Sequence, residues 1–357
     1  MRAGITRTRK GIMESLLWKE INEQPDVIRQ LVADQSDPIR RLGVELRKKP
    51  FRFIFLAARG TSDNAARYGQ YLFGAVNRLP VALAAPSLFT VYRKPPALDS
   101  ALVIGISQSG ESPDIVGVLE EAHRQGAATV AITNRQDSPL ARAAGHVLML
   151  GAGEEQSVAA TKTYTSQLAV LAMLSMALDN RLSENALDPV VAWMEAALKA
   201  EPEARSAAER IADSDRAVVI GRGYQYCTAY EIALKIKELA GVEAEPYSTA
   251  DFQHGPKAMA EGGMPAIFIT VGPTFRSETA SLADAVRGQG ARVVLIGDME
   301  TGAHSGDSKI PVALGEPEWL TPIAAVIPGQ LLAFHLARAR GLDPDQPRHI
   351  RKITRTH

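Results

Sequence analysis

Three serines, a glutamine and a glycine occur together in the six residues from Ser107 to Ser112. Serine hydroxyls and the amides of a helix's first turn donate hydrogen bonds, so this composition is typical of a cradle for a phosphate group. The stretch has no lysine, which disfavours nucleotide phosphates of the Walker type and favours the phosphate of a small molecule. The alternative is an ordinary serine-capped turn between a strand and a helix.

Lys235 and Glu238 are three residues apart in a segment of helical periodicity that ends at Gly241, so they share one flank of a predicted helix. Taken alone, such a pair is a solvated ion pair. The alternative is a functional role, because a carboxylate can move a proton in general acid–base catalysis. An amine can also activate a carbonyl group covalently.

His254 stands before Gly255 and Pro256, which do not continue a helix, so its imidazole is predicted to lie on a turn within a structured loop from Ser248 to Pro256. The other histidines are predicted on a helix surface, in polar surroundings or inside an apolar helix: His123, His146, His304, His357 and His335. No two histidines have the spacing of a zinc site and Cys227 is the only cysteine, so we expect no metal and no cofactor.

These groups need elements that position them. Ala101 to Ile106 is a continuous apolar run, typical of a strand buried on both faces, and Pro113 suits the first turn of the helix after it. Further strands are predicted at residues 51–57, 81–84, 129–133 and 147–150. Strands alternating with helices at this spacing predict an α/β fold with a doubly wound, mainly parallel sheet. A helical pattern from Glu14 to Asp34, broken at Pro25, is predicted to pack on this domain.

Two hydroxyl-rich turns follow neighbouring strands of this predicted sheet. Thr61 and Ser62 follow the strand at 51–57, and the serines from Ser107 onward follow the strand at 101–106. Ligands of open α/β sheets lie at the carboxyl ends of the strands, so both turns are expected around one ligand. A third stretch, Ser157 to Thr163, opens another helix with hydroxyls and a lysine; it is either a capped surface helix or part of the binding site.

The second half of the chain repeats the first. The interval of 163 residues between Gly60 and Gly223 also separates Ile104 from Ile267 and Ile132 from Leu295. At the place of the serine cradle, however, the second copy has Thr270-Val271-Gly272-Pro273, in which most hydroxyls are gone and proline removes an amide. Only the first copy is therefore expected to hold phosphate.

The composition limits the class of protein. A chain of 357 residues with 46% hydrophobic content suggests two domains, and zero formal charge gives no broad basic field for nucleic acid or a membrane surface. We expect a cytoplasmic protein with no apolar run long enough to span a membrane. The expected organisation is a disordered extension at 1–12, a first domain with its helix at 13–196, a second domain at 205–340 and a catalytic tail at 341–357.

The motifs together resemble a known family. Ser107 to Ser112 is similar to the phosphosugar-binding segment of sugar isomerase (SIS) domains, and Glu14 to Thr354 resembles the isomerase half of the glutamine:fructose-6-phosphate aminotransferases. Five further segments carry the resemblance: Gly60-Thr61-Ser62, Val158 to Lys162, Lys235 to Glu238, His254-Gly255-Pro256, and Asp345 to Arg348 leading to Lys352. The resemblance implies two tandem SIS domains, each a three-layer αβα sandwich with a flavodoxin-like sheet.

The resemblance also implies residue roles. Lys352 resembles the lysine that forms an imine with the ketose carbonyl, Glu238 the base that moves a proton between C1 and C2, and His254 the ring-opening residue that a partner subunit of a homodimer lends. Lys235 resembles a supporting lysine. The implied phosphate ligands are Thr61, Ser62, Ser107, Gln108, Ser109 and Ser112, and the implied pocket residues are Gly60, Val158 and Ala160.

The chain begins without the glutaminase domain of the aminotransferases, so the favoured hypothesis is a stand-alone deaminase that converts glucosamine 6-phosphate to fructose 6-phosphate and ammonia. Arg59 stands where the aminotransferases usually have cysteine, Ala160 replaces a serine, His349 an asparagine and His357 a glutamate. The first two changes leave the exact sugar open. The alternatives are an isomerase or deglycase for another amino-sugar or fructosamine phosphate, and a non-catalytic phosphosugar-binding regulator.

Overall fold

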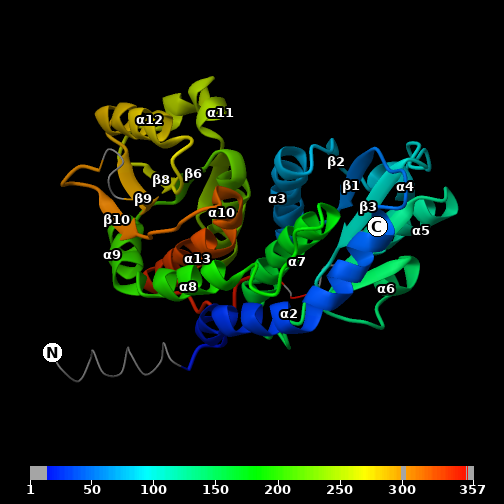
Figure 1. Cartoon of the computed structure of the whole chain (residues 1–357). Helices are drawn as coiled ribbons and strands as arrows, with labels where there is room; N and C mark the ends of the chain where they lie inside the picture. The colour runs from blue at the N-terminus through cyan, green and yellow to red at the C-terminus, as the bar shows by residue number, and fades with distance from the viewer. Residues whose placement is uncertain (1–13, 299–302, 351, 353–357) are drawn as a thin grey trace. The chain divides into compact units, whose positions relative to one another are not determined.

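The computed structural model describes residues 14–298, 303–350 and 352, which form two compact units (Figure 1). The first-sheet unit comprises residues 26–154 and 162–188, and the second-sheet unit comprises residues 14–25, 155–161 and 189–352. Each unit is described by itself. The predicted extension at 1–12 and the last residues of the predicted tail, including His357, lie outside the described residues. The domain boundaries expected from the sequence stay a proposal.

The first-sheet unit contains five parallel strands in the order β2-β1-β3-β4-β5. The strands are β1 (Phe53–Ala57), β2 (Val81–Leu83), β3 (Ala101–Ile106), β4 (Ala128–Thr133) and β5 (His146–Met149). The helices are α3 (Thr61–Val76), α4 (Ser87–Thr90), α5 (Pro113–Arg124), α6 (Pro139–Ala143) and α7 (Lys162–Leu178). Helices α3 and α7 pack together on one face of the sheet, and α4, α5 and α6 cover the other (Figure 1).

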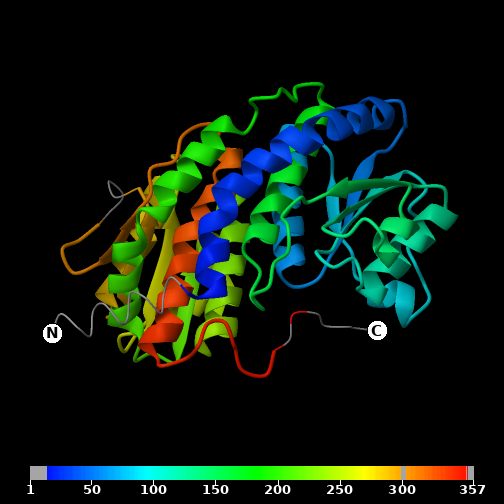
Figure 2. The same cartoon turned by 90° about the horizontal axis from the view of Figure 1, so that it is seen from below.

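The second-sheet unit has the same topology, with five parallel strands in the order β10-β9-β8-β6-β7. The strands are β6 (Arg216–Ile220), β7 (Glu243–Tyr247), β8 (Pro265–Thr270), β9 (Arg292–Gly297) and β10 (Ser308–Pro311). The helices are α8 (Asp188–Leu198), α9 (Glu201–Ile211), α10 (Tyr226–Ala240), α11 (Thr249–Gln253), α12 (Arg276–Gly288) and α13 (Pro322–Ala339), with short 3₁₀ turns at Gly223–Gln225, Pro256–Met259 and Glu318–Leu320. Helices α10 and α13 pack side by side (Figure 2).

The duplication predicted from the sequence is confirmed by the two sheets, because each strand of one has a counterpart in the same position of the other. Gly60 and Gly223 follow the first strand of each sheet and both have positive φ, 55° and 60°. Every residue of the central strands β3 and β8 is buried. The predicted doubly wound α/β fold with two copies is therefore correct.

The first described helix corrects one prediction. Helix α2 runs without interruption from Leu16 to Leu46 and includes Pro25, where a break was expected. Proline lacks the amide that would bind the carbonyl of Ile21, four residues earlier. The side-chain amide of Gln24 donates to that carbonyl instead, over 2.9 Å, and also to Gln330 of α13 over 2.7 Å. The carbonyl therefore keeps a donor and the helix continues.

Helix α13 corrects the prediction that no apolar run is long enough to span a membrane. Among the described residues it alone has the length and apolar composition of a membrane span, which the sequence was expected to lack, yet 89% of that stretch is buried. This burial is that of a core helix, and His335 within it is 3% exposed. The loop predicted at Ser248 to Pro256 contains the short helix α11, which Ser248 caps by accepting from the amide of Asp251.

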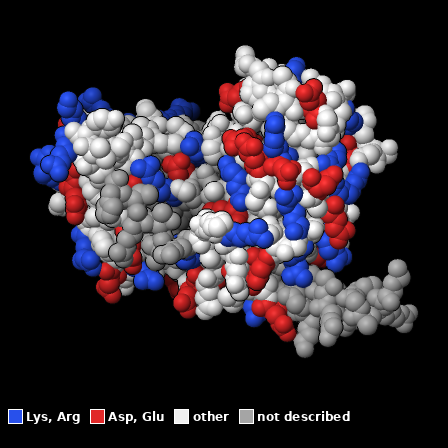
Figure 3. All heavy atoms as spheres, turned by 180° about the vertical axis from the view of Figure 1, so that it is seen from behind, with Lys and Arg blue, Asp and Glu red and all other residues white. Residues whose placement is uncertain are grey.

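Charged side chains are mixed on the surface. On the face drawn in Figure 3, lysines and arginines lie among aspartates and glutamates over the described residues. This mixture agrees with the formal charge of zero.

Candidate functional site

The serine turn in the first-sheet unit is ordered by its own hydroxyls. Ser107 accepts from the amide of Gly110 over 3.1 Å, and Ser109 accepts from the amide of Glu111 over 3.3 Å. Gly110 has a φ of 65°, and a Cβ there would lie 2.2 Å from the Ser138 hydroxyl, so only glycine fits. Ser112 precedes α5 but makes no side-chain cap. A serine-capped turn therefore does not account for Ser112.

The two predicted turns of the first-sheet unit are joined by an ion pair. Arg59, in the turn after β1, donates from Nε to Asp114 Oδ2 over 2.7 Å, and Asp114 lies in the first turn of α5. Ser62 is fixed as well, because its hydroxyl accepts from Gln167 over 2.9 Å. Burial raises the pKa of Asp63 against the opposing charges of Arg67 and Arg59. The side chains expected to bind phosphate thus start from turns that are tied together.

The pair Lys235 and Glu238 is not solvated in the second-sheet unit. Lys235 Nζ donates to Glu238 over 2.5 Å and lies 3.4 Å from Glu231, and the exposed fractions of these three side chains are 1%, 24% and 0%. Burial lowers the pKa of Lys235, but the carboxylates of Glu231 and Glu238 outweigh burial and raise it above its ordinary value. Lys235 is therefore a buried cation that orients the Glu238 carboxylate.

Lys352 belongs to the same unit and joins this charged group through Glu155. Its Nζ donates to Glu155 Oε2 over 2.8 Å and to the carbonyl of Ser157 over 2.7 Å. The Glu155 side chain is fully buried and also acts electrostatically on Lys235. A single network of three carboxylates and two lysines thus contains Glu238, Lys235 and Lys352.

Glu238 also lines a cavity. The cavity has a volume of about 710 Å³ and lies between the end of α10 and the chain that follows α13. The tail contributes Gln346 to His349, which includes the His349 that replaces the family's asparagine. The partly exposed carboxylate of Glu238 is therefore accessible to a small molecule, whereas Lys235 beneath it is not.

The predicted pocket residues Val158 and Ala160 and the predicted ring-opening residue His254 lie in different parts of the second-sheet unit. Val158 and Ala160 belong to the loop 155–161 of the second-sheet unit, the loop that holds Lys352, and both are partly buried. His254 ends α11 and is exposed on a turn, as predicted. Within this unit, α11 and the chain that follows α13 lie at opposite ends (Figure 1).

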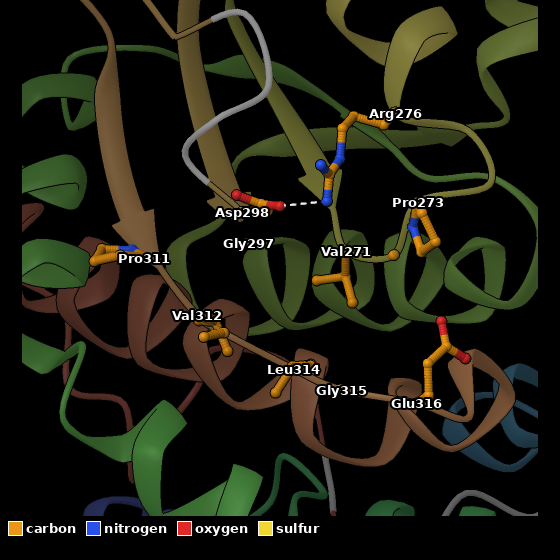
Figure 4. Close-up of a pocket in the computed structure, with 12 residues that line it drawn as sticks. Val271, Pro273, Arg276, Gly297, Asp298, Pro311, Val312, Leu314, Gly315 and Glu316 are labelled. Atoms are coloured by element: carbon orange, nitrogen blue, oxygen red, sulfur yellow. Dashed lines mark hydrogen bonds and ion pairs between the residues drawn. The ribbon is translucent and has the colours of Figure 1, made fainter.

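The second copy has a cavity of its own at the carboxyl ends of β8, β9 and β10, with a volume of about 360 Å³ (Figure 4). Arg276 and Asp298 form an ion pair of 2.5 Å at its edge. The lining residues are Val271, Gly272, Pro273, Arg276, Gly297, Asp298, Pro311, Val312, Ala313, Leu314, Gly315 and Glu316. These residues include no serine or threonine, so no side-chain hydroxyl lines this cavity.

Sequence reasoning missed two members of the charged network. Glu231 lies four residues before Lys235, and this helical spacing was a usable signal for a third charge on the same flank. Glu155 lies in a loop two residues before Ser157, where no periodic pattern marks it. Among the described residues, no group of histidines, cysteines and carboxylates could hold a metal ion.

Comparison with known proteins identifies the family of both copies. The SIS domain model matches residues 46–177 and 210–340. The glutamine–fructose-6-phosphate aminotransferase of Methanothermobacter thermautotrophicus is 35% identical over 345 residues, which cover 96% of this chain and 58% of the relative, so the chain spans little more than half of that protein.

Solved structures agree on the fold. The C-terminal domain of glucosamine-fructose-6-phosphate aminotransferase from Francisella tularensis superposes with a TM-score of 0.86 at 29% identity, covering 94% of this chain and 98% of that chain. A glucosamine-6-phosphate deaminase from Thermotoga maritima has a TM-score of 0.78 at 21% identity, covering 96% of this chain and all of that one. At that identity the second likeness shows only the fold.

Proposed function

Because the chain belongs to the SIS-domain family, we propose that it is an enzyme that converts glucosamine 6-phosphate and water into fructose 6-phosphate and ammonia. The observation that carries the proposal is the position of Glu238, which lines a cavity while its carboxylate forms an ion pair with the buried Lys235. Such a carboxylate is suited to move a proton between adjacent carbons of a sugar. We further propose the domain boundaries and the cytoplasmic location given by the sequence.

The serine turn is proposed to hold the phosphate of the sugar. Its hydroxyls and amides, with those of the turn after β1, supply neutral donors at the amino ends of α3 and α5. The proposed ligands are Thr61, Ser62, Ser107, Gln108, Ser109 and Ser112, with Gly60, Val158 and Ala160 lining the sugar pocket. Oriented donors of this kind favour a dianion without a metal ion.

The proposed reaction starts with the open-chain amino sugar. Glu238 removes the proton from C2 and returns it to C1, which converts the aldehyde and amine into a C2 imine and a C1 hydroxymethyl group. The Lys352 amine then adds to C2 and ammonia leaves, giving a lysine imine. Water hydrolyses that imine, which releases fructose 6-phosphate and restores Lys352.

The Lys352 amine must give up a proton before it can react. In the described structure its amine donates to Glu155 and to the Ser157 carbonyl, and a lysine in an ion pair is a protonated, non-nucleophilic group. Transfer of that proton to a carboxylate of the network would free the amine.

Ring opening is proposed for His254. This residue follows α11 and is exposed on a turn. Helix α11 and the chain that follows α13 lie at opposite ends of this unit (Figure 1), which supports the arrangement implied by the family resemblance, in which a second copy of the chain in a homodimer supplies the imidazole. An imidazole is suited to move the proton of the ring oxygen.

Arg59 favours a second candidate within the same class. Its side chain is 50% exposed beside the proposed phosphate ligands, where it adds a positive charge that the family usually lacks. An enzyme acting on another amino-sugar or fructosamine phosphate would use the same network. The charge at Arg59 does not alter the groups around Glu238.

The test is ammonia release from a panel of glucosamine, galactosamine, mannosamine and fructosamine 6-phosphates, with glucosamine as the unphosphorylated control. Turnover of glucosamine 6-phosphate is expected to be fastest, and Glu238→Gln is expected to lower kcat by about 10²-fold or more. Turnover of another sugar phosphate of the panel, without turnover of glucosamine 6-phosphate, would favour an enzyme for another amino-sugar or fructosamine phosphate. Tight binding measured by calorimetry, with no turnover of any sugar, would reject both in favour of a phosphosugar-binding regulator.

A further inference from the structure

The loop that holds Lys352 has no regular secondary structure of its own. Residues 151–160 form neither helix nor strand, so their backbone amides need partners outside a ladder. Glu155 uses its second oxygen, Oε1, to accept from the amide of Thr161 over 2.8 Å. The amides of Gln156 and Ser157 in this loop have a side-chain acceptor from elsewhere in the unit.

That side chain is Glu20, in the first turns of α2. Its carboxylate accepts from the amide of Gln156 over 2.5 Å and from the amide of Ser157 over 3.2 Å, and also from the Ser157 hydroxyl. Glu20 is 4% exposed. A buried carboxylate with three donors from two consecutive residues fixes their backbone firmly, because hydrogen bonds to a charged acceptor are among the strongest in proteins.

The same helix also holds the tail that carries Lys352. The Asp345 carboxylate accepts from the Ser15 hydroxyl over 2.8 Å and from the amides of Leu16 and Leu17 over 3.0 and 2.9 Å. Asp345 therefore caps α2. The first turns of α2 thus hold both the loop that Lys352 contacts and the chain from which Lys352 extends.

We infer that Glu20 is a positioning residue for Lys352: it holds the Gln156–Ser157 backbone so that the Ser157 carbonyl and the Glu155 carboxylate together fix the lysine amine. In this arrangement Glu20 acts on Lys352 through the loop backbone. The inference rests on the proposed function for its catalytic consequence. Its structural consequence, the restraint of one lysine amine, is independent of that function.

Glu20→Gln tests the inference. The amide has one acceptor oxygen, and its NH₂ group would face a donor of the loop, so the Ser157 carbonyl would no longer be held in place. The matched control is Glu23→Gln, which makes the same change at an exposed position of the same helix. If Glu20→Gln does not fold, Asp345→Asn tests the other attachment of Lys352.

The first measurement uses no substrate. The full chain is treated with acetic anhydride, and mass spectrometry compares acetylation of Lys352 with that of Lys237, which is 41% exposed on α10. Lys352 is expected to react more slowly than Lys237 in the parent protein. Its relative rate should rise about fivefold in Glu20→Gln and stay unchanged in Glu23→Gln. An unchanged rate in a folded Glu20→Gln protein would overturn the inference.

The second measurement uses the sugar. With the best substrate of the panel, Glu20→Gln should lower kcat about tenfold while KM stays within about twofold, because the proposed phosphate ligands are untouched. Equal loss in Glu23→Gln would contradict a role specific to Glu20. If the parent protein turns over no sugar while acetylation of Lys352 responds as expected, the proposed function fails and the positioning stands.

Discussion

Arg59 Nε lies 2.7 Å from Asp114 Oδ2, and this ion pair connects the turn after β1 to the start of the helix after β3. The second sheet repeats the arrangement, with Arg222 after β6 bonded to Glu278 in the first turn of α12. The second copy, which lacks the serine cradle, thus keeps an ion pair at the same place. Its recurrence indicates that the pair holds neighbouring strand-end turns together in both units.

Arg59→Ala and Arg222→Ala should therefore have different consequences. Each removes a charged hydrogen bond from a partly exposed pair and should lower the free energy of unfolding by about 1–2 kcal/mol in urea titrations. Only Arg59→Ala should raise KM for the sugar phosphate, by about tenfold, because only the first copy is proposed to hold phosphate. An equal rise in KM for Arg222→Ala would place phosphate binding in the second copy as well.

Gly110→Ala should disable the serine turn. Gly110 and Gly153 both have positive φ, 65° and 63°, but a Cβ at Gly110 meets Ser138 whereas one at Gly153 meets nothing within 4 Å. Gly153→Ala should cost only the backbone strain of about 1–2 kcal/mol. Gly110→Ala should cost a further ~1–3 kcal/mol from overpacking and weaken sugar-phosphate binding in calorimetry. Equal stability of the two variants would contradict the tight fit.

Lys235→Met should destabilise the second-sheet unit strongly. It removes the cation that lies 3.4 Å from the fully buried Glu231, and breaking a buried ion pair typically costs about 3–5 kcal/mol. The control is Lys237→Met two residues on, where both members of the pair with Glu245 are exposed and separated by 3.7 Å. That change should cost at most about 1 kcal/mol in the same denaturant titration. Similar losses for both would mean that Lys235 is accessible to water.

His335 should make the protein less stable in acid. Burial, followed by the charges of Arg205 and Arg338, lowers the pKa of His335 from 6.5 to about 4, although Glu201 lies 2.9 Å away and favours the charged form. The unfolded chain binds the proton first, so its contribution to stability is full above pH 6.5 and is lost as the pH falls toward 4. Thermal midpoints measured across this range should fall less steeply in His335→Gln, and His123→Gln, at an exposed site, should behave like the parent.

The sequence predicted the local features of the fold well because they depend on short-range patterns. The unbroken apolar run at Ala101–Ile106 is a fully buried strand, and α10 ends at Gly241 in the left-handed conformation. Pro113 begins α5 as expected. Each of these follows from residue types within a few positions, and none of the three requires knowledge of distant neighbours.

Features that depend on distant neighbours were not predicted. The spacing of Lys235 and Glu238 predicted that they share one side of the helix. It did not predict that other elements cover this side, so the burial of Lys235 was missed. The continuity of α2 through Pro25 depends on Gln24, whose amide is held by Gln330, 306 residues away. Glu155 pairs with a residue 197 positions later. Helical or strand periodicity carries no information about such contacts.

The cap of α2 has a consequence for how the chain is made. Ser15 and Asp345 are 330 residues apart, so the start of the first described helix emerges from the ribosome long before the carboxylate that closes it. At the usual speed of translation the wait is on the order of tens of seconds. During synthesis those amides face water, and the second-sheet unit can complete its fold only after translation has passed residue 345.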